Sequence, residues 1–310
     1  MRPSLVHLLL LALLPVIILS CSDTDGDNGW QKTDPTVNNA NHNDDSKEPA
    51  LARLEFPHTK GGSLMLIHYT NDQYGINYSV EWDIEKRAPR WSAYQMHSGT
   101  LKRNTTRYYS QNNQYPRDPM LPDSYYFSTD LFWSSGFSHG HICPSADRLY
   151  STEANYQTFF LTNMQPQYSM FNSGVDYSSP WCRLEDKVRT WAASNSTASN
   201  GQRVSDTLYV VKGGTIEDNQ LLTKIKGELR VPKYFFVALL LKNQQGYKAI
   251  GFWIEHDNQN HGSDPLNKYA MNIRELEQLT GIDFFCNLPD DVEARVEQLP
   301  RENVCRAWGI

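Results

Sequence analysis

The chain has 310 residues, of which 39% are hydrophobic, and a formal net charge of −6. This composition excludes disorder over the whole length and a small disulfide-dense protein. The charge is unevenly spread: Arg2 contributes +1, residues 22–50 contribute −5, and residues 51–310 contribute −2. The acidic balance therefore lies mainly outside the larger segment and does not exclude a nucleic-acid substrate for it.

The first 21 residues have the pattern of an export signal. An apolar run over residues 8–19 follows Arg2 and is too short for a comfortable membrane span of roughly 20 residues. It ends at Ser20-Cys21, which resembles a bacterial lipoprotein signal. We expect lipidation of Cys21 and a lipid-anchored protein of the bacterial cell envelope, at the outer membrane and facing the periplasm or the surface. An ordinary signal peptide is the alternative.

Residues 22–50 are expected to be a disordered acidic tether, since they have few large apolar side chains to bury. Residues 51–310 are then one domain with four cysteines. An even number in an exported domain suggests two disulfides. Nearness in sequence alone favours Cys143–Cys182 and Cys286–Cys305, and free buried thiols are the alternative.

Hydrophobic patterning predicts both strands and helices in the domain. The expected strands, rich in β-branched and aromatic residues, are 63–69, 78–83, 91–96, 207–211, 234–241 and 248–255. The expected helices, with apolar residues at helical spacing, are 184–194, 272–279 and 289–299. Because strands and helices are interspersed without regular βαβ alternation, we predict an α+β fold with a mainly antiparallel central sheet flanked by helices.

Between residues 99 and 182 the sequence is loop-like, and long loops inside compact domains are usually functional. Four short motifs in or next to this stretch follow one another in a fixed order. They are Ser138-His139-Gly140-His141, Asn163-Met164-Gln165-Pro166-Gln167, Asn172-Ser173-Gly174 and Trp181-Cys182-Arg183-Leu184-Glu185. This order resembles the DNA/RNA non-specific endonuclease family, the ββα-metal nucleases that include endonuclease G. Residues 90–94 and Asp118-Pro119 resemble further family segments.

The resemblance implies a Mg²⁺-dependent endonuclease that hydrolyses DNA and RNA with little sequence specificity. His141 corresponds to the general base, a role that suits imidazole, whose pKa is ordinarily about 6.5. Asn172 corresponds to the protein ligand of one Mg²⁺, or Mn²⁺ in its place, an ion that binds few protein groups and keeps its waters. Glu185 is expected to hold metal-bound water, Arg189 to contact phosphate, and Asn163 to support the site.

Two departures from the family pattern concern substrate binding. Ser138-His139 stands where the family has Asp-Arg before Gly-His, so His139 is expected to replace an arginine as a hydrogen-bond donor to phosphate. The segment 175–180 lengthens the spacing between Asn172 and Glu185. Arg87, which precedes a strand, is a further expected phosphate contact.

Three alternatives remain at this point. A catalytically weak or inactive nuclease fold would act as a binding module on the envelope. A zinc hydrolase would use His139 and His141, which share one face of a strand, or His256 and His261 would form a separate metal loop. The basic and aromatic stretch 102–109 is either part of a nucleic-acid groove or an exposed loop. The oligomeric state stays open.

Overall fold

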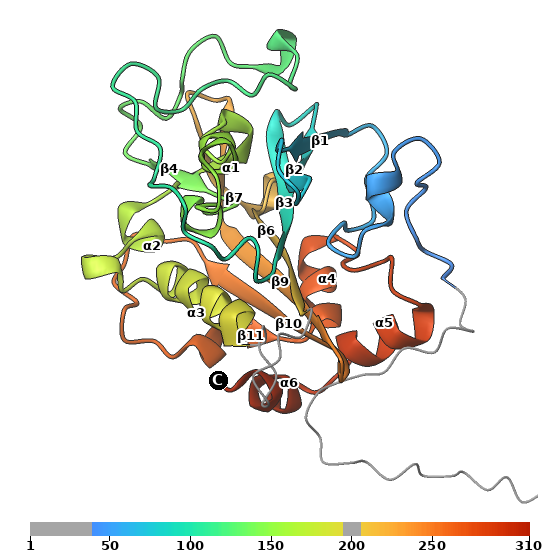
Figure 1. The fold of residues 1–310 in the computed structure, drawn as a ribbon. Helices are drawn as coiled ribbons and strands as arrows, with labels where there is room; N and C mark the ends of the chain where they lie inside the picture. Colours follow the sequence, from blue (N-terminus) through green and yellow to red (C-terminus); the bar gives the residue numbers. More distant parts are fainter. Residues whose placement is uncertain (1–38, 195–205) are drawn as a thin grey trace, which may run out of the picture.

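The structure is a computed structural model that describes residues 39–194 and 206–310. Its centre is a seven-stranded sheet in which every neighbouring pair is antiparallel (Figure 1). In sheet order the strands are β1 (Leu64–Tyr69), β2 (Ile76–Asp83), β3 (Ala88–Met96), β6 (Thr207–Gly214), β9 (Tyr234–Asn243), β10 (Gly246–Glu255) and β11 (Ala270–Met271). The expected α+β class, the antiparallel sheet and the six expected strands are confirmed.

Both faces of the sheet are buried, which explains why its central strand is almost wholly apolar. In β9, Val237 and Leu239 contribute to the core on one face, and Ala238 and Leu240 to the core on the other. Successive side chains of a strand point to opposite faces. A strand covered on both sides therefore has no solvent-facing position at which a polar residue is favoured.

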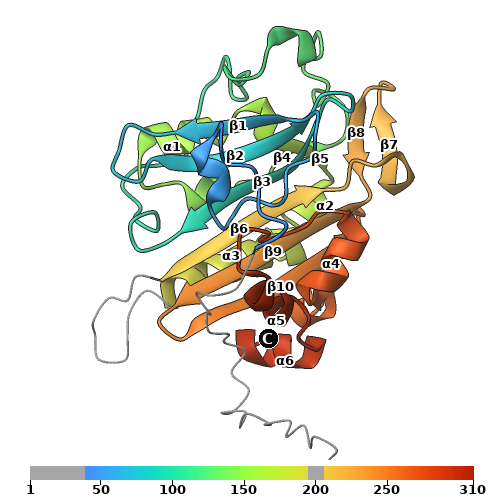
Figure 2. The ribbon, with the colours of Figure 1, turned by 90° about the vertical axis from the view of Figure 1, so that its right-hand side faces the viewer.

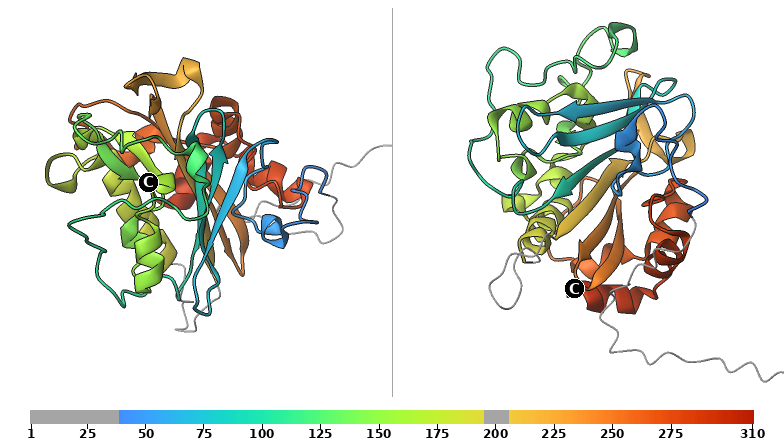
Figure 3. Two further views of the ribbon diagram at one scale, coloured as in Figure 1. Left: turned by 90° about the horizontal axis from the view of Figure 1, so that it is seen from above. Right: turned by 45° about the vertical axis from the view of Figure 1, so that its right-hand side comes forward.

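Helices cover the two faces separately (Figure 3). The longest helix, α3 (Pro180–Ser194), packs on the same face as Val237, whereas α4 (Ile273–Thr280) and α5 (Asp290–Glu297) pack on the other. The helix expected over 289–299 ends earlier, and a further helix, α6 (Arg301–Trp308), follows it. Pro300 precedes α6, a position where proline costs no backbone hydrogen bond.

A smaller unit lies on the α3 side of the sheet. Here β4 (Ser138–His141) pairs antiparallel with β5 (Met164–Gln167). The short helix α1 (Thr152–Gln157) lies between these strands in the sequence, and α2 (Ser169–Asn172) follows β5. Next to β5 lies β8 (Leu229–Pro232), which forms a hairpin with β7 (Leu221–Ile225) (Figure 2). Two antiparallel strands followed by α3 form the expected ββα arrangement.

The boundary of the domain differs from the expected one. Asn43 is buried, and its side chain donates to the Pro57 carbonyl at 3.0 Å. Asn41 donates to the carboxylates of Asp283 and Glu293 at 3.1 and 3.0 Å. Residues 39–50 therefore contact the domain, which corrects the expectation of a tether that reaches residue 50. The rest of the expected tether, the expected signal segment and Cys21 lie outside the described residues.

The expected disulfides are wrong in this structure. Cys143, Cys182, Cys286 and Cys305 are all free thiols. Cys143 is buried in the core beneath α3, and Cys286 is buried on the other side of the sheet, where its thiol lies 3.7 Å from the Phe56 carbonyl. Short separation along the chain therefore does not bring these sulfur atoms together. In the described residues no helix has the length and apolar composition needed to cross a membrane.

Candidate active site

The ribbon β4–β5 places two histidines side by side. His139 and His141 are two residues apart on β4 and so lie on the same face of the ribbon. His141 is opposite Met164 in the register of the pair. A Cβ atom at Gly140 would lie 2.2 Å from the side chain of the buried Gln167. The absence of a side chain at Gly140 therefore allows β5 to pack closely against β4.

His141 has an aromatic environment and an available nitrogen. Its ring meets Phe159 edge to face at 4.8 Å and lies 6.4 Å from Tyr115. Its Nε2 is shielded from solvent and has no hydrogen-bond partner among residues 39–194 and 206–310. Burial, followed by the positive charge of Arg107, lowers the pKa of His141 to about 3. The imidazole is therefore neutral near pH 7, as a general base must be.

His139 is held in a stack instead of pointing freely into solvent. Its ring lies parallel to Tyr115, with centroids 3.7 Å apart, and to Phe132, with centroids 4.3 Å apart. Its Nε2 is 2.9 Å from Asp130 Oδ2. Burial acts to raise the pKa of Asp130, but the hydrogen bond with His139 helps to lower it below its ordinary value. The side chain expected to reach phosphate is thus already hydrogen-bonded to a carboxylate.

Asn172 is the last residue of α2, which lies against both β4 and α3. Its side-chain amide has no hydrogen-bond partner in the part of the chain that the structure describes, and the side chain is half-buried. Gly174 has φ of 72°, and a Cβ atom there would lie 2.6 Å from the Ser179 backbone nitrogen. Glycine is therefore required for the turn that leads from Asn172 into α3.

Glu185 lies on α3 and is paired across the core with a strand residue. Its Oε1 is 2.6 Å from the Nζ of Lys212 on β6, and this ammonium also lies 4.3 Å from the centre of the Trp181 ring. Burial raises the pKa of Glu185, Lys212 lowers it, and the nearby Asp147 raises it. The second carboxylate oxygen of Glu185 has no hydrogen-bond partner among residues 39–194 and 206–310, so it remains for another partner.

Arg189, expected to contact phosphate, is bound by two carboxylates. Its guanidinium donates to Asp147 at 2.7 Å and also to Asp186. Asp147 is buried and accepts a further hydrogen bond, of 2.8 Å, from Tyr94. Burial acts to lower the pKa of Arg189, but the negative charge of Asp147 helps to raise it above its ordinary value. In this arrangement Arg189 fixes α3 to the loop after β4.

Asn163 is fully buried, and backbone groups engage its amide. Its Oδ1 accepts from the Cys143 backbone at 2.8 Å, and its Nδ2 donates to the carbonyls of Cys143 and Thr158 at 2.9 and 2.8 Å. The side chain therefore ties together the segments that follow β4 and α1. The structure gives it a positioning role next to His141, with no free donor on Nδ2.

Arg87 lies away from the two histidines, against a loop. It donates to the carbonyls of Tyr125 and Tyr126, pairs with Glu228 at 3.2 Å, and stacks on Phe127 at 3.9 Å. The structure thus does not bring Arg87 together with His141. It is instead part of the wall of a neighbouring pocket.

One cation that was not singled out from the sequence does lie at the site. The exposed Arg107 places its guanidinium 4.7 Å from the centre of the Phe159 ring, which also contacts His141. Its positive charge lowers the pKa of His141, and burial lowers the pKa of Arg107 itself. Arg107 forms no ion pair with the rest of the described chain. The basic stretch 102–109 was the sequence signal that contained it.

The histidines do not form a metal centre with other strong ligands. Among the described residues no group of three or more His, Cys, Asp or Glu side chains is placed to hold a metal ion. Both ring nitrogens of His256 are bonded to backbone, Nδ1 to Pro232 at 2.7 Å and Nε2 to Tyr168 at 2.8 Å. His261 is bonded to Asp257 and Asp264. The expected metal loop with these two histidines is therefore not supported.

Comparisons with known proteins agree with this geometry. A family model described as DNA/RNA non-specific endonuclease matches residues 66–291. The chain is 33% identical to a nuclease of Nostoc sp. over 71% of this chain and 75% of that protein, and 25% identical to human mitochondrial nuclease EXOG over 68% and 56%. The solved structure of the EndoG/EndoGI complex has the same fold, with a TM-score of 0.57 at 17% identity, over 73% of this chain and 88% of the other. The chain therefore belongs to the DNA/RNA non-specific endonuclease family.

Proposed function

We propose that the protein hydrolyses phosphodiester bonds in DNA and RNA without sequence specificity, with His141 as the general base that activates water. The observation that carries the proposal is the shielded, unpartnered Nε2 of a neutral imidazole. Hydrolysis needs such a base together with groups that stabilise charge on the phosphoryl oxygens. Nuclease names among the relatives agree with this chemistry.

Oxygen donors on α2 and α3 fit a divalent metal with hard oxygen ligands, and α2 contacts both α3 and β4, the strand that carries His141. Asn172 offers its amide oxygen and Glu185 its second carboxylate oxygen, directly or through water. Mg²⁺ binds few protein groups and keeps several waters, so two donors on adjacent helices suit it, and Mn²⁺ has similar preferences. When bound, the ion supplies positive charge to the phosphoryl group and the departing oxygen.

Arg107 supports the proposal because it supplies a guanidinium where the family arginine is replaced by His139. The guanidinium is exposed, lies beside the same ring as His141 and has no acidic partner among the described residues. Arginine binds phosphate through several donors at once. We therefore assign phosphate binding to Arg107, whereas Arg189 positions Asp147 and α3.

The test compares the purified protein with His141→Ala on plasmid DNA and on single-stranded RNA, with Mg²⁺ or with EDTA. We expect cutting that needs the metal and falls by at least about 100-fold in the variant. The matched control is His58→Ala, since His58 is an exposed histidine that is distant from His141 in the sequence. Equal activity of the two variants would exclude His141 as the base.

A non-catalytic binding module is the second candidate, and the stacked His139 favours it because the family arginine is missing. It predicts nucleic-acid binding without cutting between about pH 5 and 9. Activity that returns only with Zn²⁺ would support a zinc hydrolase instead. The same plasmid assay therefore separates the three candidates, provided that binding is measured alongside it.

We also propose that the protein is anchored in the bacterial cell envelope through lipid on Cys21. Support comes from the apolar run over residues 8–19 that ends at Ser20-Cys21. In bacteria that express the chain, Cys21→Ser is expected to abolish lipid labelling and to move the protein out of the membrane fraction. Unchanged fractionation would contradict the anchor.

A further inference from the structure

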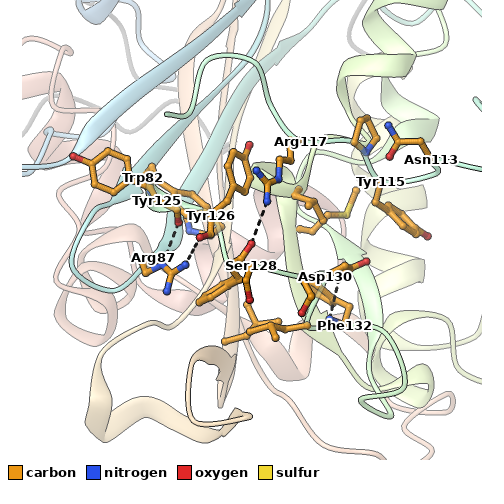
Figure 4. A pocket seen from close by; sticks show the side chains of 18 of the residues that line it. Trp82, Arg87, Asn113, Tyr115, Arg117, Tyr125, Tyr126, Ser128, Asp130 and Phe132 are labelled. Carbon is orange, nitrogen blue, oxygen red and sulfur yellow. Dashed lines mark hydrogen bonds between the residues drawn. The ribbon is translucent and has the colours of Figure 1, made fainter. Parts of the chain in front are cut away.

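We propose that a pocket beside the active site binds one unpaired nucleobase of the strand that is cut. The inference rests on the proposed function, since it places the base in the same strand as the phosphate at His141. The pocket has a volume of about 610 Å³, within the range of roughly 300–1,000 Å³ that is typical of small-ligand sites. The pocket is shown in Figure 4.

The pocket shares a wall with the active site. Tyr115 and Phe132 line it, and these are the two rings between which His139 is stacked. Asp130, which accepts the hydrogen bond from His139, also lines it. Since His139 is two residues from His141 on one strand, a nucleotide next to the phosphate at His141 is within reach of this wall.

The lining suits a flat aromatic ring with a polar edge. Aromatic side chains dominate it: Trp82, Tyr115, Tyr125, Tyr126, Phe127, Phe132 and Tyr156. Polar side chains at its rim, among them the exposed Asn113, Ser128 and Thr129, offer donors and acceptors. Nucleobases stack on aromatic rings whatever their identity, and hydrogen-bond through their edges. A base therefore matches this lining better than a purely apolar ligand does.

Two arginines add positive charge at the pocket. Arg87 stacks on Phe127 at 3.9 Å and Arg117 on Tyr126 at 4.9 Å. Arg117 also donates to the Phe127 carbonyl at 3.3 Å (Figure 4). Arg87 pairs with Glu228 at 3.2 Å, and Arg117 pairs with Asp123 at 2.9 Å. Both carboxylates are exposed, so these surface ion pairs contribute little to stability. A phosphate next to the bound base would therefore meet two guanidinium groups.

The occupant must be an unpaired base. A base in a duplex is stacked between its neighbours and paired, so it reaches an enclosed site only after it leaves the helix. In a single strand, or at an end or a bulge, the same movement costs less. The pocket is thus expected to favour unpaired strands over intact duplex.

The pocket is tested by binding, with the His141→Ala protein so that the strand stays intact. The probes are fluorescent 12-nucleotide single strands of DNA in which one abasic site is moved through the sequence, measured by fluorescence anisotropy. We expect one position at which loss of the base weakens binding by about five-fold or more, since base stacking contributes that much. At the other positions the effect is expected to be small.

A filled pocket provides the second measurement. Ser128→Trp places a large ring at the rim, and Ser124→Trp is the matched control because Ser124 is exposed in the short 3-10 helix just before it (Asp123–Tyr125) and does not line the pocket. Ser128→Trp is expected to weaken binding of the intact strand and to remove the position dependence, whereas Ser124→Trp leaves both unchanged. Identical behaviour of the two variants, or an equal effect of every abasic position, would overturn the proposal.

The outcome is independent of the catalytic proposal. If the unmodified protein cuts neither DNA nor RNA but the position dependence is present, the proposed hydrolysis fails and the pocket stands. If the protein cuts but every abasic strand binds equally, the pocket fails and the hydrolysis stands.

Discussion

Arg107 and His141 contact the same aromatic ring, that of Phe159. The histidine meets this ring edge to face at 4.8 Å, and the guanidinium lies 4.7 Å from its centre. After burial, the charge of Arg107 is the largest cause of the lowered pKa of His141. One arginine thus helps to keep the base neutral and is also exposed to solvent, as the proposed phosphate contact must be.

Replacement of Arg107 is therefore expected to affect activity strongly. Arg107→Ala should lower kcat/KM on single-stranded DNA by about 10- to 100-fold, because it removes a charged hydrogen-bond donor to phosphate. Arg107→Lys should restore part of this loss, since the charge returns without the planar fork. Steady-state kinetics test this against Arg103→Ala, an exposed arginine on the same loop. Equal losses in the two alanine variants would contradict a specific role for Arg107.

The pH dependence of activity follows from the state of His141. Because its pKa is lowered to about 3, the neutral base persists as the pH falls below its ordinary value of about 6.5. The acid limb of kcat/KM should therefore lie well below pH 6.5. Rates are measured from about pH 4.5 to 7 at saturating Mg²⁺, with circular dichroism to show that the fold is intact. A half-maximal rate near pH 6.5 would show an ordinary histidine pKa.

The family resemblance that the order of the motifs carries was sufficient to predict the ββα fold. Each motif has a local reason to exist, such as glycine at 140 beneath Gln167 and glycine at 174 in a left-handed turn. These constraints act over a few residues or across one strand pair. The central sheet was predictable for a similar reason, since β9 is apolar on both faces.

The partners of the charged residues were not predictable in the same way. Arg189 meets Asp147, which is 42 positions earlier, and Glu185 meets Lys212 on another strand. Helical spacing puts Arg189 on the same face as Glu185 but does not reveal the carboxylates that bind it. The cysteine pairing failed for the same reason, because distances across the fold do not follow separation in sequence.

The Glu185–Lys212 pair is expected to contribute to stability as a unit. Lys212→Met leaves the half-buried carboxylate of Glu185 without its cation, which should lower the free energy of unfolding by about 1–3 kcal/mol. Adding Glu185→Gln removes the unpaired charge and should restore most of this loss. Urea unfolding of the wild type, both single variants and the double variant gives the coupling energy. Additive effects would show that the pair is not coupled.

Glu297 is expected to make the stability of the domain fall as the pH rises, as a buried acid does, although its Oε2 accepts a hydrogen bond from Arg274 at 3.1 Å. It is fully buried, its Oε1 has no partner in the described chain, and burial together with the nearby Glu277 and Glu293 raises its pKa to about 10. The folded state thus holds a proton that the unfolded state loses near pH 4.5, so stability should fall as the pH rises between these values. Glu297→Gln removes this dependence and should stabilise the domain by roughly 1–3 kcal/mol at pH 8 and little at pH 4.5. Thermal or urea unfolding at both pH values measures this change in stability. Glu302→Gln is the control, because Glu302 is exposed. If Glu297→Gln were destabilised at pH 8, the carboxylate of Glu297 would be ionised and held by Arg274.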